Sequence, residues 1–324
     1  MIEEAIPAAA AEVLDEGTLC YLAAASPRGP HVTPVVFVHH GGRVWATTAR
    51  GSVKARLWKR DPRAAGLVVA GDRAVTFRGS VRRHDALDPG TWASSLARAP
   101  ALARASTRFT LKNLRYFAGY ARDARRVPFG WTPPGRVLVS LGLEEGVVLG
   151  GGAVTERWGP LGGALEGRIS FRAARGPALG GDGLPAEVRA LLDEPGSAAL
   201  GVAPAGGLDV VPARWAPAPE EGVVYAVVSR EVLASAGPVI AGGAVPAALV
   251  VDRASRWRAA DMTGLMLRGR GEVFDLEKVA SGARSLEARA GQAGPLPSDA
   301  VVVRLKPERM VWWLGWSSGT VFRP

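Results

Sequence analysis

The sequence predicts a mainly β protein with some α-helix, built from two small closed barrels in tandem. Three observations support this prediction. The length of 324 residues suits two domains, the chain contains an internal repeat, and each copy is a succession of short β-rich runs separated by turns. Short antiparallel strands lose their exposed edges by closing into a barrel. The apolar fraction of 48% is that of a globular chain, which excludes wholesale disorder.

The internal repeat pairs three segments of the first half with three of the second, in the same order. The pairs are 17–35 with 196–213, 75–81 with 265–271, and 137–154 with 302–319. The middle pair aligns Arg78-Gly79 with Arg268-Gly269. We therefore expect an N-terminal domain over residues 1–154 and a C-terminal domain over 186–324. A linker rich in Gly and Pro would join them at 155–185.

The first copy shows the expected elements in chain order. Its β-rich runs are broken by Gly- and Pro-containing turns, and its helical stretches are rich in Ala, Leu and Arg. The expected strands are Leu19–Ala25, His31–His39, Arg43–Thr48, Ala64–Ala70, Arg73–Arg83 and Val137–Leu143, and the expected helical stretches are Ser52–Arg60 and Pro89–Arg126.

Composition narrows the function classes. The lone Cys20 excludes an internal disulfide, and no Cys/His cluster has metal-ligand spacing, so no metal is expected. The N-terminus is acidic where a signal peptide is basic, and no apolar run approaches about 18 residues. We therefore expect a cytoplasmic protein that uses no membrane.

The net charge of +10 is unevenly spread along the chain. Residues 1–159 hold 22 Lys+Arg and 13 Asp+Glu, whereas residues 160–324 hold 18 and 17. An anionic ligand of the first half is one explanation, and a basic surface for nucleic acid is its rival. The sequence contains no aromatic-basic nucleic-acid motif, so we expect a small-molecule partner and no nucleic acid.

The segment 42–69 has the pattern of a phosphate site. A predicted strand ends in the hydroxyls of Thr47 and Thr48, Arg50 follows in a turn, and Ser52 is a suitable N-cap for a helix that carries Lys54 in its first turn. Free backbone N–H groups, the positive end of the helix, hydroxyls and an ammonium would converge on an anion. A solvated face of a basic amphipathic helix is the alternative interpretation of the same charges.

This segment resembles the FMN-binding split β-barrel family, which includes pyridoxamine 5′-phosphate oxidase and the flavin/deazaflavin oxidoreductases. The resemblance rests on Thr47-Thr48, on Gly51-Ser52-Val53-Lys54, on Asp61-Pro62-Arg63-Ala64, and on the hairpin with Arg73-Ala74-Val75 and Gly79-Ser80-Val81. It covers residues 10–85 well and the remaining strands more loosely.

The resemblance implies two tandem split β-barrel domains packed as an intrachain pseudo-dimer, with a cofactor in the cleft between them. It implies that Thr48, Ser52 and Lys54 reach the cofactor phosphate, with Thr47 and Arg50 nearby. The strand around Thr33 and Val35 would contact the ring. The cofactor would be FMN or a deazaflavin coenzyme of the F-420 type, which the sequence does not distinguish.

The sequence departs from the family pattern at several positions. Val53 stands where the family has a second phosphate Arg, Ala74 replaces a flavin-contacting Gln, and no Arg-Leu-His motif lies near the C-terminus. A true pyridoxamine 5′-phosphate oxidase is therefore not expected.

The second copy has no lysine after its strand near Ser229, and the uncharged run Val232–Val251 is expected to be a buried helix without an anion site. One chain would then be a monomeric pseudo-dimer, or a homodimer of such chains, with one competent cleft per chain. Trp312, Trp313 and Trp316 would either wall that cleft or pack at the seam between the barrels.

The expected function is that of an FMN- or deazaflavin-dependent oxidoreductase that transfers hydride to or from a small organic substrate. Flavin chemistry needs no protein nucleophile, so no catalytic residue is assigned. The alternative is a non-catalytic flavin- or ligand-binding protein, or a barrel without a cofactor.

Overall fold

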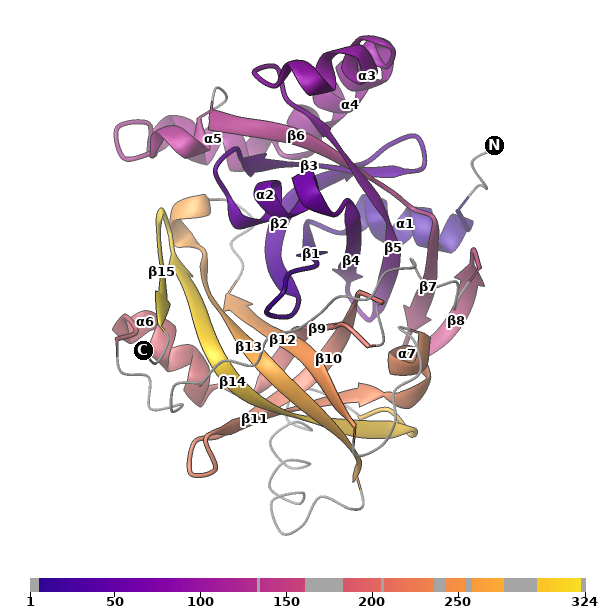
Figure 1. Cartoon of the computed structure of the whole chain (residues 1–324), viewed down its shortest axis with the longest axis vertical. Helices are drawn as coiled ribbons and strands as arrows, with labels where there is room; N and C mark the ends of the chain where they lie inside the picture. The colour runs from indigo at the N-terminus through magenta and orange to yellow at the C-terminus, as the bar shows by residue number, and fades with distance from the viewer. Residues whose placement is uncertain are drawn as a thin grey trace.

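Two antiparallel β-barrels pack against each other in the computed structural model, the N-terminal one in indigo to magenta and the C-terminal one in orange to yellow (Figure 1). The structure describes residues 6–132, 135–160, 183–204, 207–235, 243–253, 258–276 and 296–321. The predicted fold class, a mainly β chain with two tandem barrels, is confirmed. The linker prediction at 155–185 lies mostly outside the described residues. No helix in the described part of the chain is long and apolar enough to span a bilayer.

The N-terminal barrel closes in the strand order β1-β2-β3-β6-β5-β4, with β4 pairing back onto β1. A further hairpin, β7–β8, continues the sheet beyond β5. Its elements are α1 (Ala8–Glu16), β1 (Leu19–Ala24), β2 (His31–His39), β3 (Arg43–Ala49), α2 (Val53–Arg60), β4 (Arg63–Ala70), β5 (Arg73–His84), α3 (Trp92–Leu96), α4 (Ala99–Lys112), α5 (Leu114–Arg122), β6 (Arg136–Gly142), β7 (Glu145–Gly150) and β8 (Ala153–Trp158).

The C-terminal barrel closes in the order β9-β10-β11-β14-β13-β12, with β12 pairing back onto β9. The run Val232–Val251 was expected to be one buried helix, but its residues 244–251 belong to the strand β12, where the consecutive apolar side chains from Ala247 to Val251 are buried. Residues 232–235 end the short helix α7, and residues 236–242 lie outside the described part of the chain. The elements are α6 (Ala186–Arg189), β9 (Gly196–Val202), β10 (Asp209–Ala218), β11 (Val223–Ser229), α7 (Arg230–Ser235), β12 (Ala244–Arg253), β13 (Thr263–Asp275), β14 (Ala300–Leu314) and β15 (Ser317–Val321).

The two barrels have the same strand order, as expected for a duplicated domain. Strand β14 takes the place of both β6 and β7, and the register shifts between Arg268 and Gly269 where it passes from one role to the other. Gly79 and Gly269 hold equivalent positions. A Cβ on Gly79 would lie 2.1 Å from the Gly142 carbonyl oxygen, and a Cβ on Gly269 would lie 2.0 Å from that of Lys306. Each glycine therefore allows the two strands to approach closely.

One continuous apolar core joins the barrels. It includes Val32 and Leu67 of the first barrel together with Leu200 and Trp215 of the second. Gly201 of β9 lies so close to β2 that a Cβ there would be 2.5 Å from a methyl carbon of Val32. Burial of this shared surface is the main stabilising term that holds the two barrels in a fixed relation.

The helical stretch expected over Pro89–Arg126 forms the three helices α3, α4 and α5, which lie over one end of the first barrel (Figure 1). Helix α4 is anchored through the buried Ala105 and Phe109, which pack with Trp45 on β3. Helix α5 reaches the second barrel, where Asp123, just beyond its end, forms an ion pair with Arg258 at 2.7 Å. The helices thus connect the two barrels above the seam.

Candidate functional site

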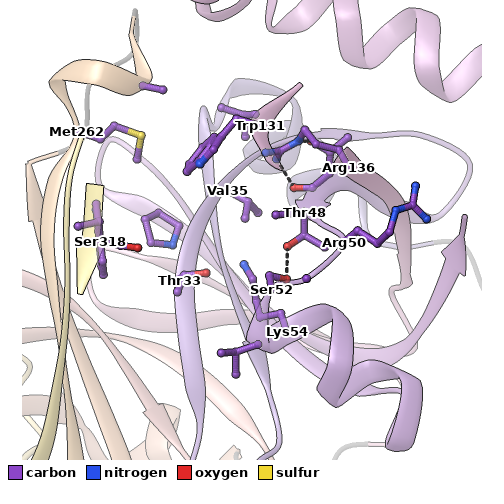
Figure 2. A pocket seen from close by; sticks show the side chains of 18 of the residues that line it. Thr33, Val35, Thr48, Arg50, Ser52, Lys54, Trp131, Arg136, Met262 and Ser318 are labelled. Carbon is purple, nitrogen blue, oxygen red and sulfur yellow. Dashed lines mark hydrogen bonds between the residues drawn. The ribbon is translucent and has the colours of Figure 1, made fainter. Parts of the chain in front are cut away.

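A cavity of about 1080 Å³ lies between the two barrels. Strands β2 and β3 and the start of α2 form its wall on the first barrel, and Met262 and strands β14 and β15 form its wall on the second (Figure 2). Helices α4 and α5 contribute Phe109, Tyr116 and Tyr120. The volume is at the upper end of the range of about 300–1,000 Å³ that is typical of small-molecule sites.

The turn between β3 and α2 presents unpaired backbone donors to this cavity. Ser52 caps α2, because its Oγ accepts a hydrogen bond from the Ala55 amide at 3.1 Å, and it also forms a 2.9 Å hydrogen bond with Thr48 Oγ1 (Figure 2). Within the described part of the chain, the amides of Gly51, Val53 and Lys54 donate to no acceptor. Three N–H groups at the start of a helix, next to two hydroxyls, form a site for an anion.

Lys54 is buried beside these donors. Its side chain is only 4% exposed, lines the cavity, and forms no ion pair with a described Asp or Glu. Burial, together with the charge of Arg136, lowers the pKa of Lys54 to about 7. A buried ammonium without a counter-ion is unfavourable, and an anion in the cavity would relieve that cost. The prediction of a solvated helix face is therefore wrong for Lys54, although Lys59 and Arg60 of the same helix are exposed.

Arg136 is a second cation of the cavity, and sequence reasoning missed it. It opens β6 and donates from Nε to Thr47 Oγ1 at 2.9 Å and from a terminal nitrogen to the Thr47 carbonyl at 2.8 Å. Its guanidinium lies 5.3 Å from the ring centre of Trp131 (Figure 2). Arg136 approaches Thr47 only because β6 pairs with β3, and this contact joins residues far apart in the sequence.

Arg50 also lines the cavity, but its guanidinium forms an ion pair with Asp85 at the end of β5. Arg83 contacts the same carboxylate at 3.6 Å. Arg50 is therefore held at the rim of the site by a protein carboxylate, whereas Lys54 is not. Its expected place near the phosphate stays a prediction.

Thr33 and Val35 lie on β2, between the turn that carries Ser52 and the wall of the second barrel (Figure 2). The neighbouring residues His31, Pro34 and Val36 line the cavity too. The structure thus brings all seven predicted cofactor-binding residues to one cavity: Thr33, Val35, Thr47, Thr48, Arg50, Ser52 and Lys54.

Aromatic side chains close the other side of the cavity. The ring of Trp316 meets Tyr120 at a centroid distance of 5.0 Å and Trp131 at 5.3 Å, both nearly perpendicular. Trp312 and Trp313 line the cavity and also pack against Gly319 and Gly264, respectively. Trp313 and Trp316 also pack against a cluster that includes Leu19 and Tyr116 of the first barrel. The two roles expected for the C-terminal tryptophans, lining the cleft and packing at the seam between the barrels, therefore coexist.

His84 is one of two buried histidines in the cavity wall; the other is His31. The Nε2 of His84 lies 3.2 Å from Ser140 Oγ, and its ring stacks on Trp45 with centroids 5.5 Å apart. Burial and the charge of Arg43 lower the pKa of His84 to about 4, so the ring is neutral near pH 7. Among the residues that the structure describes, no group of three or more His, Cys, Asp or Glu could hold a metal ion.

The corresponding strand–helix junction of the second barrel keeps a serine cap but lacks the preceding turn, the lysine and the open amide of the first. Ser229 is at once the last residue of β11 and the cap of α7, so the turn through Arg50 and Gly51 has no counterpart. Glu231 stands two residues after this cap, where the first barrel has Lys54. The Asp299 carboxylate accepts the Glu231 amide at 2.9 Å and the Ser229 hydroxyl at 2.8 Å.

Comparison with known proteins gives one match to a protein family. Residues 6–126 match the family described as pyridoxamine 5′-phosphate oxidase, and this segment contains the turn of Ser52, helix α2 and the helices above the cavity. No curated protein matches the chain.

Three solved structures illustrate the structural similarities, each covering less than half of this chain. An FMN-binding, pyridoxamine 5′-phosphate oxidase-related protein of Nostoc punctiforme is 17% identical, with a TM-score of 0.32, and covers 44% of this chain and 78% of its own. A FAD-binding protein of Mesorhizobium loti is 16% identical, with a TM-score of 0.32, and the match covers 46% of this chain and 97% of that protein. A heme-binding protein of Mycobacterium smegmatis is 18% identical, with a TM-score of 0.34, and the match covers 48% of this chain and 59% of that protein.

The family match covers the segment whose motifs predicted this family. The second barrel repeats the strand order of the first, as expected for a duplicated domain. The resemblance of this chain to the pyridoxamine 5′-phosphate oxidase-like split β-barrel family, as a tandem duplication, is thus confirmed.

Proposed function

We propose that this chain is an oxidoreductase that binds FMN or a deazaflavin coenzyme of the F-420 type in the cavity between its barrels. It would move a hydride between the ring and a small organic substrate. The observation that carries the proposal is the anion site at the start of α2. Unpaired amides, the hydroxyls of Thr48 and Ser52, and the buried Lys54 meet there in a cavity whose described lining holds no Asp or Glu.

The second barrel supports this interpretation through an internal comparison. The amide of Glu231 donates to the Asp299 carboxylate, whereas the amide of Lys54, its counterpart, has no acceptor among the described residues. At the second junction the chain supplies the Asp299 carboxylate and has no lysine. At the first it has Lys54, and the described cavity lining supplies no carboxylate. A phosphate on the ligand would complete the first junction as Asp299 completes the second.

The residues present fit a phosphate-bearing coenzyme with a planar ring. Thr48, Ser52 and Lys54 would hold the phosphate, and β2 around Thr33 and Val35 would run beside the ring. A bound flavin or deazaflavin supplies the hydride chemistry itself, so the protein contributes binding, orientation and exclusion of water. The aromatic wall at Trp316 would exclude water from the ring and give a substrate an apolar surface.

A non-catalytic ligand-binding protein is the second candidate. Val53 stands where the related proteins have a second Arg for the phosphate, and Ala74 stands where they have a Gln that contacts the flavin. The site therefore lacks these two contacts, and the Val53 side chain is 41% exposed. Reduction of the bound coenzyme separates the two candidates. An oxidoreductase would reduce or reoxidise the bound ring with a small organic substrate, whereas a carrier would leave its spectrum unchanged.

Binding is tested by titrating the full chain with FMN and with the deazaflavin coenzyme while following ligand fluorescence. At least one should bind, and Lys54→Ala should weaken that binding by about 1–3 kcal/mol, or roughly 5- to 150-fold in Kd, because it removes a charge-assisted contact to the phosphate. Lys59→Ala, on the exposed side of the same helix, is the matched control and should bind as the unaltered protein does. Failure of both coenzymes to bind, or equal Kd values for the two variants, would contradict the proposal.

A further inference from the structure

Arg136 stands in the cavity wall with most of its donors unused. Its Nε and one terminal nitrogen donate to the hydroxyl and the carbonyl oxygen of Thr47, at 2.9 and 2.8 Å. These bonds use two of the five N–H donors of a guanidinium, and no described acceptor takes the others. No described Asp or Glu forms an ion pair with Arg136, and the described lining of the cavity contains no acid. The remaining donors are therefore available to a ligand.

The end of β3 separates this arginine from the anion site at the start of α2. Successive side chains of a strand point to opposite faces. Thr48 turns toward Ser52, with 2.9 Å between their hydroxyl oxygens. Thr47 instead turns toward Arg136. Figure 2 shows Arg136 on one side of Thr48 and Lys54 on the other, so the cavity has two separate cationic ends.

Aromatic side chains continue from Arg136 along the cavity wall. The ring centre of Trp131 lies 5.3 Å from the guanidinium carbon. Trp316 meets both Trp131 and Tyr120 nearly at right angles, and Tyr120 in turn lies 5.5 Å from Tyr116 between ring centres. All five residues line the cavity. Such a wall accepts a flat apolar ring through stacked or edge-to-face contacts, and Arg136 places a positive charge at its end.

The second barrel shows that the fold does not require an arginine at this position. Ala49, the last residue of β3, pairs in register with Arg136, the first residue of β6. In the second barrel Ser229, the last residue of β11, pairs with Ala300, the first residue of β14. An alanine thus completes the same strand pairing there. The arginine occurs only in the barrel that also carries Lys54, which favours a role in ligand binding.

We propose that Arg136 and the aromatic wall of Trp131, Trp316 and Tyr120 form the substrate subsite of the cavity, and that the substrate is a flat, conjugated carboxylic acid. Its carboxylate accepts hydrogen bonds from the remaining donors of Arg136, whose planar fork matches two oxygen atoms. Its ring lies against the aromatic wall. This inference rests on the proposed function, since the coenzyme at the Lys54 end supplies the redox chemistry.

The test uses a flat aromatic acid and its uncharged amide, 2-naphthoate and 2-naphthamide, which differ only at the carboxylate. Both are titrated into the full chain, without coenzyme and with the coenzyme that binds at saturation. In each case the acid should bind about tenfold more tightly than the amide, because only the acid forms charge-assisted bonds to the guanidinium. Equal Kd values for acid and amide would overturn the proposal.

Substitutions locate the preference for the acid. Arg136→Gln should remove it, because glutamine keeps a polar side chain without the charge. Arg136→Lys keeps the charge but loses the planar fork, so the preference should fall there too, and this variant serves if the glutamine variant does not fold. Trp131→Ala should weaken acid and amide by similar factors, because it removes part of the wall.

Arg82→Gln is the matched control, because Arg82 is an exposed arginine of β5 that pairs in register with Ser140 of β6. This variant should keep the whole preference for the acid. A full preference in Arg136→Gln, or in Arg136→Lys where that variant is used, would overturn the proposal.

Two further outcomes separate the subsite from the coenzyme phosphate site. Lys54→Ala should keep the preference for the acid, whereas its loss would place the carboxylate at the start of α2 and overturn the proposal. A loss of coenzyme affinity in Arg136→Gln as large as that in Lys54→Ala would assign Arg136 to the phosphate and would also overturn it. If neither coenzyme binds, the proposed function fails, and the titrations without coenzyme still decide whether the subsite exists.

Discussion

The two strand–helix junctions of the duplicated barrels show how one fold either makes or closes an anion site. At the first, the amides of Gly51, Val53 and Lys54 have no acceptor among the described residues, and helix α2 places the Lys54 side chain beside them. At the second, the turn is absent, Glu231 replaces the lysine, and Asp299 accepts the free donors. The amides at a helix start need acceptors, which side chains, water or a ligand can supply. The second junction uses the Asp299 carboxylate, whereas the first opens onto the cavity.

The seam between the barrels repeats this contrast. Arg78 is held by Glu145 and Asp209, whereas Arg268 faces Arg309 and His31. In both comparisons one copy of the duplicated position lies beside acids of the chain, whereas the other, at Lys54 or Arg268, has no carboxylate of the described residues within ion-pair distance.

The largest expected effect that tests the contrast between Arg78 and Arg268 is the loss of stability on replacing Arg78. Arg78→Met should destabilise the protein by about 3–5 kcal/mol, because it leaves the carboxylates of Glu145 and Asp209 buried without their counter-ion. Arg268→Met should be neutral or stabilising in the ligand-free protein, because it removes a buried charge that has no carboxylate of the described residues within ion-pair distance. Urea unfolding of the two variants measures the difference. Equal losses of stability would show that the two arginines have the same role.

A smaller effect separates the two helix caps. Ser52→Ala and Ser229→Ala should each cost about 1 kcal/mol of stability, since each serine caps its helix. Only Ser52→Ala should also weaken coenzyme binding, because only that hydroxyl lines the cavity. Thermal unfolding and coenzyme titration of both variants check this. Weaker binding by Ser229→Ala would contradict the assignment of one site per chain.

Much of the fold follows from the sequence because it depends on local patterns. The alternation of apolar residues predicts β2 with the bounds that the structure has, His31–His39, and β1, β3, β4 and β5 to within a residue or two. The repeat predicts the common strand order, because equivalent apolar runs occupy equivalent strands. The helix expected over Val232–Val251 is wrong for residues 244–251, because a short uncharged stretch has no period that distinguishes a strand from a buried helix.

The candidate site can be predicted from the sequence only where its residues are neighbours in the chain. The turn and helix through Ser52 and Lys54 are one segment, so their chemistry is visible in it. Arg136 reaches Thr47 through the pairing of β6 with β3, and Asp299 reaches the start of α7 through the fold of the second barrel. Such contacts between distant residues leave no local pattern, and neither does the burial of Lys54 within a run of otherwise exposed bases.

The central claim is that the duplication retains one competent cleft. Isothermal titration of the full chain with the coenzyme that binds measures this directly through the number of sites. The account predicts one coenzyme per chain, lost or weakened in Lys54→Ala and unaffected by Glu231→Ala, which alters the equivalent position of the second barrel. Two coenzymes per chain, or one that depends on Glu231 and not on Lys54, would contradict it.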